Sequence, residues 1–333
     1  MTTQKEQPAE KFKTAIGGQA LIEGIMMRGP DKDAIVIRTK EGLQTQITER
    51  KLPKPGSFKT WPLIRGCVGF FDAQVHGVKA LMHSADLSPE EDDEPAQSKF
   101  DQWLEKKLGS EKFQQGVIGF SVFLGLAMSI GLFFVLPALI GGFFQFESTL
   151  ATNLVEGLIR IMIFMGYMLL VSRMKEMKRV FAYHGAEHKT IRCYEAGLPL
   201  TVENVREQTR LHPRCGTSFL LVVMIISILL FSVASSALLA VMPQLVALQT
   251  GSPVLYKAIM LVFKLLLLPV VVAITYEINR WIGRHDNAFT RVLSAPGMWM
   301  QNFTTNEPDD SMIEVGIAAL EAVIPDQEGA DRW

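Results

Sequence analysis

Four long apolar segments constrain the fold of this chain more than any other feature. They cover residues 116–144, 151–172, 219–242 and 254–281. About 20 apolar residues are enough to cross a bilayer as a helix, and each segment reaches that length. Lipid offers the backbone no hydrogen-bond partners, so a single spanning segment of this kind must be helical. The sequence therefore predicts an α-helical membrane protein with four transmembrane helices.

The composition agrees with this class. Hydrophobic residues make up 48% of the 333 residues and charged residues only 20%, a balance typical of membrane proteins. The net charge of −1 gives no reason to expect a nucleic-acid partner. Three cysteines are too few for a disulfide framework, and the polar, glycine-rich first thirty residues lead us to expect no cleaved signal peptide. The lipid bilayer is the first partner that the sequence predicts.

The distribution of Lys and Arg predicts the orientation of the spans. These residues crowd the loop between the second and third segments, precede the first segment and follow the fourth. The two opposite loops contain neither. By the positive-inside rule, we expect a multi-pass protein of the cell membrane with both termini and loop 173–216 in the cytoplasm.

A few charged residues fall inside the apolar segments. Glu156 and Arg160 stand four residues apart in the second segment, which is the spacing of an ion pair on one helix face. We expect this pair towards one end of the span. Lys264 and Glu277 belong to the fourth segment and are the residues that a transport path would need.

The rest of the chain divides by composition. Residues 34–38 and 43–50 alternate apolar and polar positions around a Gly-containing turn, which predicts a β-hairpin. The expected organisation is a disordered N-terminus (1–13), a small β-rich cytoplasmic module (14–60), an amphipathic helix (61–85), an acidic linker (86–97), the membrane domain with its loop (98–283), and a cytoplasmic C-terminal tail with an amphipathic helix (284–333). Within the membrane domain, a short charged helix at 98–112 precedes the first span.

The amphipathic helix carries one apolar row with steps of three and four residues. Its members are Ile64, Val68, Phe71, Val75, Val78 and Met82. Such a row usually packs on a core, so we expect it to cover the β-rich module or the membrane helices. A helix that lies in the lipid interface is the alternative.

Metal-binding residue types gather between the second and third spans. On a helix, His184 and His188 stand one turn apart and can hold one ion, with Glu187 beside them. His-x-x-Glu-His is the reversed form of a zinc-protease motif in which the Glu acts on a metal-bound water. His212 and Cys215 follow before the third span and are further ligands of the kind that zinc prefers. If the helix of the second span continues out of the bilayer without a break, it carries both motif histidines on one rigid helix.

The number of ligands decides between two roles. Four ligands (His184, His188, His212 and Cys215) would make a closed structural site, whereas three would leave a position for water and make Glu187 the catalytic residue. Glu187 is alternatively a group that orients an imidazole or an ion-pair partner of Lys189 or Arg192. The remaining histidines and cysteines are interpreted as interfacial or structural: His76, His83, His285, Cys67 and Cys193.

Three separated segments of the chain resemble the bacterial YqhQ-like family. They are residues 17–28, 183–189 and 212–218, and the similarity extends over most of 16–323. That family is regarded as a group of metal-dependent membrane enzymes of unknown reaction. The resemblance therefore implies metal chemistry at His184, Glu187, His188, His212 and Cys215, and it names no substrate.

These observations lead to three hypotheses. The first is a metal-dependent hydrolase, with zinc or a similar divalent ion, that acts on a peptide or membrane-associated substrate. The second is a membrane scaffold or assembly factor with a structural metal site, and the third is a transporter. Gln19, Glu23 and Arg28 of the glycine-rich stretch have either a binding or a packing role, and the oligomeric state is left open.

Overall fold

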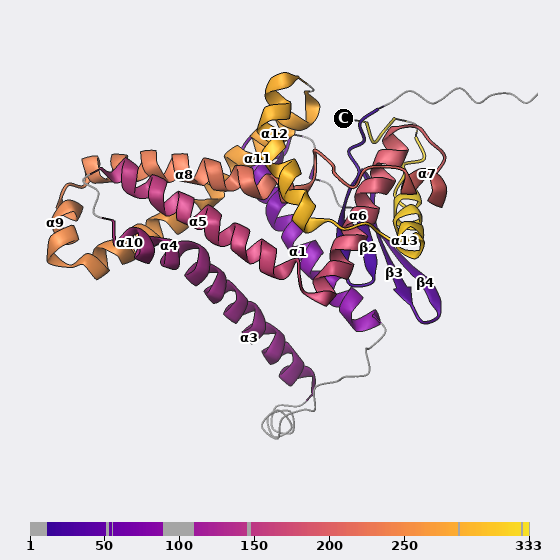
Figure 1. Ribbon diagram of the computed structural model, residues 1–333, viewed down its shortest axis with the longest axis horizontal. Helices are drawn as coiled ribbons and strands as arrows, with labels where there is room; N and C mark the ends of the chain where they lie inside the picture. The colour runs from indigo at the N-terminus through magenta and orange to yellow at the C-terminus, as the bar shows by residue number, and fades with distance from the viewer. Residues whose placement is uncertain are drawn as a thin grey trace, which may run out of the picture. The chain divides into compact units, whose positions relative to one another are not determined.

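The chain forms two compact units, which alternate along the sequence (Figure 1). The computed structural model describes residues 12–50, 53–54, 56–88, 110–144, 148–285, 287–327 and 329–332. The first unit comprises Met1–Pro89, Met168–Ile226 and Leu268–Trp333, and the second comprises Glu90–Tyr167 and Ser227–Leu267. Most of the predicted disordered N-terminus, acidic linker and charged helix at 98–112 lies outside the described residues.

A four-stranded antiparallel sheet forms the base of the first unit. Its strands are β1 (Gly17–Leu21), β2 (Gly24–Arg28), β3 (Lys32–Thr39) and β4 (Gly42–Glu49), and they neighbour one another in chain order. The predicted hairpin is the β3–β4 pair, closed where Thr39 lies opposite Gly42. Gly42 has a φ of +127°, a conformation that glycine adopts without strain. The glycine-rich stretch before it is a second hairpin, β1–β2.

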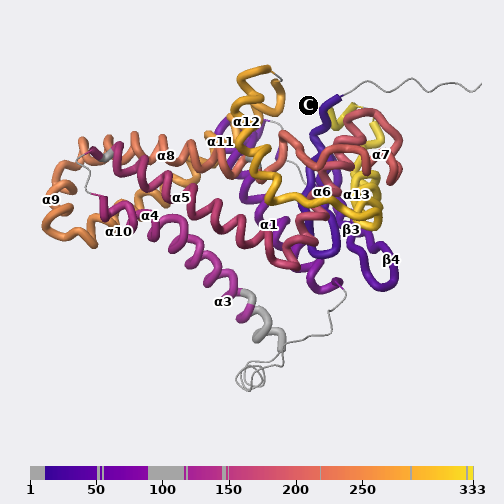
Figure 2. The backbone as a smooth tube through the Cα atoms, in the orientation of Figure 1, coloured from indigo at the N-terminus to yellow at the C-terminus, as the bar shows by residue number. Residues whose placement is uncertain are grey.

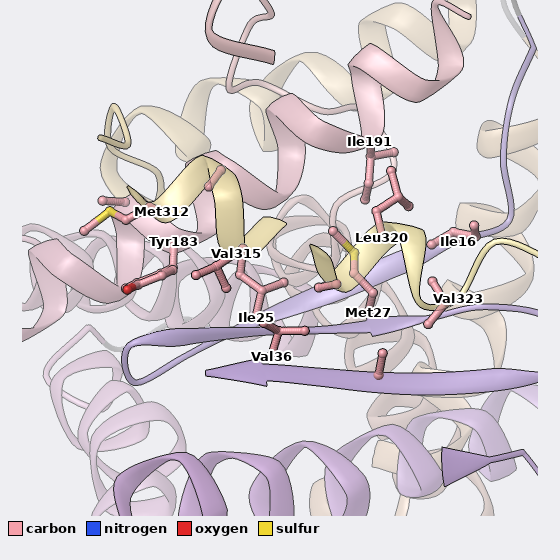
Figure 3. Close-up of a cluster of buried hydrophobic side chains, with 14 residues drawn as sticks. Ile16, Ile25, Met27, Val36, Tyr183, Ile191, Met312, Val315, Leu320 and Val323 are labelled. Atoms are coloured by element: carbon pink, nitrogen blue, oxygen red, sulfur yellow. The ribbon is translucent and has the colours of Figure 1, made fainter. Parts of the chain in front are cut away.

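Helices α6 (Lys175–Glu195) and α13 (Asp310–Glu321) cover one face of this sheet. Successive strand residues point to opposite faces, so Ile25 and Met27 of β2 meet the two helices while Met26 faces away. Figure 3 shows this core, in which Tyr183 and Leu320 pack over the strands. The predicted closing helix is α13, which starts where the Asp309 side chain accepts a hydrogen bond from the amide of Met312.

Helix α1 (Ile64–Leu87) lies on the other face of the sheet and also along α11 (Leu268–Arg284). Its packed face consists of small residues (Gly66, Gly77, Ala80 and Ser84). A Cβ atom at Gly66 would lie 2.8 Å from the Tyr276 side chain, so only glycine allows this close approach. The predicted helix is confirmed, but the packing expected for its apolar row is wrong.

The apolar row of α1 faces outward. Phe71 is 60% exposed, Val75 51% and Val78 48%. The periodicity gave the helix correctly but could not show that small residues, rather than large ones, let two backbones come together. A helix built in this way presents a large apolar surface that nothing in the described part of the chain covers.

Four helical stretches of the described residues are long and apolar enough to cross a membrane. They are Gly119–Gly141, Leu150–Val171, Phe219–Val241 and Pro253–Arg284. The helices that form them are α3 (Ser110–Ile130) with a π-helical turn (Gly131–Val135) and α4 (Leu136–Gly141), α5 (Thr149–Val171), α8 (Gly216–Val241), and α10 (Pro253–Leu266) with α11. The short helix α9 (Gln244–Gly251) follows α8. Length and composition thus mark the chain as a membrane protein with four candidate spans.

Charged residues inside the second unit find partners on other helices. Lys264 Nζ lies 2.6 Å from Glu156 Oε2 in a buried ion pair. Arg160 Nε donates to the carbonyl of Phe133 at 2.7 Å, a carbonyl freed because Pro137 has no N–H to offer one turn later. The predicted pairing of Glu156 with Arg160 is therefore wrong, because Glu156 pairs with Lys264 and Arg160 donates to the Phe133 carbonyl instead.

The C-terminal region belongs to the first unit. Helix α12 (Ala288–Thr304), which the sequence analysis did not predict, precedes α13. Thr14 Oγ1 donates to Asp331 Oδ2 at 2.5 Å, and an isolated bridge joins Thr14 to Arg332. Figure 2 shows the indigo and yellow parts of the tube close together in this unit. Residues separated by most of the sequence therefore share one core.

The helical conformation is interrupted between α5 and α6. Met174, with φ −66° and ψ 138°, is extended, so the continuous helix that the sequence allowed from the second span to the motif histidines is not formed. Neither Pro nor Gly marks this break in the sequence. Helix α6 is buried on all sides from Phe181 to Ile191, and its packing on the sheet and α13 sets its course.

Candidate metal centre

Three ligand atoms from α6 and the loop before α8 converge in the first unit. His184 and His188 are one turn apart on α6, and Cys215 directly precedes α8. One nitrogen of each histidine and the Cys215 sulfur all lie within 4.8 Å of one another, and all three residues are buried. Two imidazoles and a thiolate at this spacing are a ligand set suited to zinc.

Backbone carbonyls orient both imidazole rings. The Nδ1 atom of His184 lies 2.8 Å from the Thr304 carbonyl, and that of His188 lies 2.6 Å from the Arg210 carbonyl. A carbonyl oxygen only accepts, so each Nδ1 must carry the proton and donate it. In the neutral rings, each Nε2 then keeps its lone pair, which is the arrangement typical of metal-ligating histidines.

Cys215 alone cannot provide a hydrogen-bond partner for the Nε2 atoms of both His184 and His188. His184 Nε2 lies 3.2 Å from Cys215 Sγ, while His188 Nε2 is buried without a hydrogen-bond partner. Whether the shared proton lies on the sulfur or on His184 Nε2, it joins only that pair and leaves the lone pair of His188 Nε2 unsatisfied. A cation between the three atoms would satisfy all of them, so the residues present fit a metal ion.

The electrostatics of the site favour a thiolate. Burial raises the pKa of Cys215, but the neighbouring His184 and His188 outweigh it and hold that pKa well below its usual value. Burial likewise opposes charge on His184, yet the Cys215 thiolate raises the pKa of His184 to about 9, so without a cation the two residues form an imidazolium–thiolate pair, and a bound ion would take the place of the His184 Nε2 proton. Since the thiolate is the form that ligates metal, the site favours the state of Cys215 that binding needs.

Glu187 lies beside the three ligands and not among them. Its side chain packs against β1, where a Cβ on Gly18 would lie 2.9 Å from the Glu187 Cδ atom, and its Oε2 is buried without a hydrogen-bond partner. Burial raises the pKa of this carboxyl group. The predicted alternative of an ion pair is not formed, because Lys189 pairs with Glu307 and Arg192 donates to the carbonyl of Leu211.

His212 is close to the ligand group but is held differently. Its ring centroid lies 5.5 Å from that of His188, and its Nε2 lies 3.5 Å from Glu195 Oε2. Gln301 of α12 receives a bond from the His212 amide and donates one to the His212 carbonyl, both at 2.7 Å. Burial lowers the pKa of His212 to about 4, so the ring is neutral, but it does not belong to the group of atoms that converge.

Several residues of the site carry no sequence signal. Thr304 and Arg210 contribute backbone carbonyls, which any residue type provides. Gln301 lies 89 residues from His212, and only tertiary structure brings them together. Gly18 is the exception, since it belongs to the glycine-rich stretch that the resemblance singled out.

The other residues of that stretch lie away from the ligands. Gln19 fills the space that Gly77 of α1 leaves open. Glu23 accepts two bonds of 2.5 Å from Arg179 and one from the Tyr183 hydroxyl. Arg28 pairs with Asp33 and with Asp72 of α1. Through these contacts the three residues hold the sheet against α1 and α6, which is a packing role.

The fold and the site together define a class: a multi-span, mainly helical protein of membrane type, with a small antiparallel sheet and a buried His–His–Cys group able to hold a metal. The profile of a family described as "Protein of unknown function (DUF1385)" matches residues 61–326. The chain is also 32% identical over 324 residues to the uncharacterized protein YqhQ of Bacillus subtilis (strain 168). The aligned region covers 94% of this chain and 93% of that relative. The chain belongs to the DUF1385 family, and the resemblance to YqhQ is confirmed. No solved structure matches it.

Proposed function

We propose that this protein is an integral membrane metalloenzyme, a hydrolase whose divalent ion is held by His184, His188 and Cys215 on the cytoplasmic side. The observation that carries the proposal is the convergence of two imidazole nitrogens and the Cys215 sulfur in a buried space, with His188 Nε2 left without a hydrogen-bond partner. A zinc ion with three protein ligands keeps one position for water, lowers the pKa of that water and polarises a carbonyl. Zinc suits this mixture of sulfur and nitrogen ligands best.

The protein's own residues would supply the proton transfer. Glu187 Oε2 has no hydrogen-bond partner, so it is free to accept a proton. Its raised pKa brings the carboxylate closer to the range in which general bases work at neutral pH. The carbonyls of Thr304 and Arg210 keep both imidazoles in the ligating tautomer, and burial of the group excludes bulk water.

A structural metal site in a membrane scaffold is the second candidate. The observation that favours it is the burial of the whole group, with His188 only 1% exposed and the His212 ring centroid 5.5 Å from that of His188. In that case the ion would fasten α6 to the segment before α8, and the exposed surfaces of the first unit would serve partners.

Substitution Glu187→Gln separates the two candidates. In the enzyme, the amide cannot take up the proton, so hydrolysis should fall about 100-fold or more, while metal content and melting temperature stay near those of the wild type. The measurement is mass spectrometry of products after incubation of purified full-length protein with a mixture of synthetic peptides in detergent. Glu203→Gln, an exposed acid on α7 (Val202–Arg206), is the matched control.

The scaffold makes the opposite prediction. A strain that lacks the protein would then be complemented equally well by wild type and by Glu187→Gln, but not by a variant that has lost the metal. That pattern, together with no cleavage by the wild type, would refute the enzymatic proposal and leave the metal site standing.

A further inference from the structure

A cleft of about 1020 Å³ lies between the sheet and α1, within the first unit. The sheet contributes side chains such as Met26 and Gln46, and α1 contributes a row of polar ones that includes Asp72 and Lys79. Arg280 of α11 closes one side. None of the three metal-ligating residues lines this cleft, so it is a separate site.

The lining of the cleft has an excess of positive charge. Among the described residues that line it, six are Lys or Arg and three are Asp or Glu. Arg28 is neutralised by Asp33 and Asp72, and Arg65 by Glu277. The cations without a carboxylate at ion-pair distance in the described part of the chain are Lys59, Lys79 and Arg280.

Arg280 has a hydrogen-bond donor that no described residue satisfies, although Glu277 lies within electrostatic range of its charge. Its Nε atom is buried and has no hydrogen-bond partner. Leaving a charged donor in this state is costly unless something else accepts its hydrogen bond. A phosphate group, with several acceptor oxygens and a negative charge, matches a guanidinium in a cleft that lysines also line.

The exposed apolar row of α1 borders the cleft. At about 100° per residue, the row of Phe71, Val75 and Val78 is next to the row of Asp72, His76 and Lys79 that lines it. The first turns of α1 lie against α11, since Leu63 N–H and Arg65 both bond to Glu277. Helix α11 is part of the fourth candidate span, so this apolar row lies beside a segment expected in the bilayer.

We propose that the cleft binds the phosphate of an anionic phospholipid from the bilayer, with the acyl chains along the exposed apolar row of α1. The two halves of the surface match the two halves of that ligand: unpaired cations for the head group and large apolar side chains for the tail. Trp61, which precedes α1 and is 58% exposed, suits the membrane–water boundary, where tryptophan is enriched. A soluble phosphate would use the cations and leave the apolar row without a role.

The test is lipid binding by the purified full-length protein in detergent, followed by native mass spectrometry. Phosphatidylglycerol should bind at least tenfold more tightly than phosphatidylcholine. Lys79→Gln and Arg280→Gln should each weaken phosphatidylglycerol binding about fivefold, the usual effect of one cation at an anionic lipid. Lys40→Gln, at the exposed tip of the β3–β4 hairpin and outside the cleft, should bind as the wild type does.

A second arm separates the lipid from free phosphate. Phe71→Ser should weaken phosphatidylglycerol binding while metal content and melting temperature stay unchanged, and millimolar inorganic phosphate should not displace the lipid. Equal binding of the two lipids would overturn the proposal. So would an unaltered affinity in Phe71→Ser, or full competition by inorganic phosphate, since either result would indicate a site for a soluble anion.

Discussion

His188→Ala should release the metal from the protein. Wild-type protein purified in detergent is expected to hold about one zinc or similar ion per chain, and the variant close to none, because only two of the three converging atoms remain. Loss of one ligand from a three-ligand site removes much of the binding free energy of the ion. The measurement is elemental analysis of the purified full-length chain, with thermal unfolding recorded on the same samples.

Two controls make this result specific. His76→Ala removes an exposed imidazole whose ring contacts Asp72 of the same helix, so the metal content of this variant should equal that of the wild type. Cys215→Ser replaces the sulfur by a smaller oxygen that is not ionised at neutral pH, and it should lose zinc while the fold persists. If His188→Ala keeps one ion per chain, the three-ligand site is wrong and the proposed function falls with it.

Gly185→Ala should destabilise the first unit more than alanine at any other of its described glycines. A Cβ at this position would lie 2.0 Å from the backbone carbonyl oxygen of Asn306, and the Asn306 amide is itself bonded to the Phe181 carbonyl at 2.8 Å. A backbone segment held on both sides cannot move away as a flexible side chain can. We expect a loss of about 3 kcal/mol or more and a fall in melting temperature of roughly 10 °C.

Gly166→Ala is the matched control for this substitution. It also lies within a helix, and a Cβ there meets nothing within 4 Å. Its melting temperature should stay close to that of the wild type or rise slightly, because alanine favours a helix over glycine. An equal effect of the two substitutions would show that the contact between α6 and the segment before α13 is not tight.

Local pattern was enough to predict most elements of the fold. The apolar runs gave the four candidate spans, the alternation at 34–50 gave the β3–β4 hairpin, and the spacing of 64–82 gave α1. The direction in which these elements pack was not predictable in the same way. Glycines at 66 and 77 decided which face of α1 is covered, and a partner from another helix decided where Glu156 binds.

The candidate site shows the same division. The helical spacing of His184 and His188 and the residue type of Cys215 were visible in the sequence, and the structure brings these three together. The sequence could not show that His212 is held through its backbone by Gln301, or that Glu187 turns towards Gly18. Both arrangements depend on residues that lie far away along the chain, and no periodicity records them.

The bond between Thr14 and Asp331 shows that the last part of the chain completes the first unit, and this has a consequence for biosynthesis. The pocket around the three ligands needs the Thr304 carbonyl, and the core beneath it needs Leu320 and Val323. While the ribosome is still synthesising the fourth span, all three candidate ligands have been made, but Thr304, Leu320 and Val323 have not. Metal capture should follow release of the nascent chain, and a truncation after residue 300 should leave an inserted but ion-free protein.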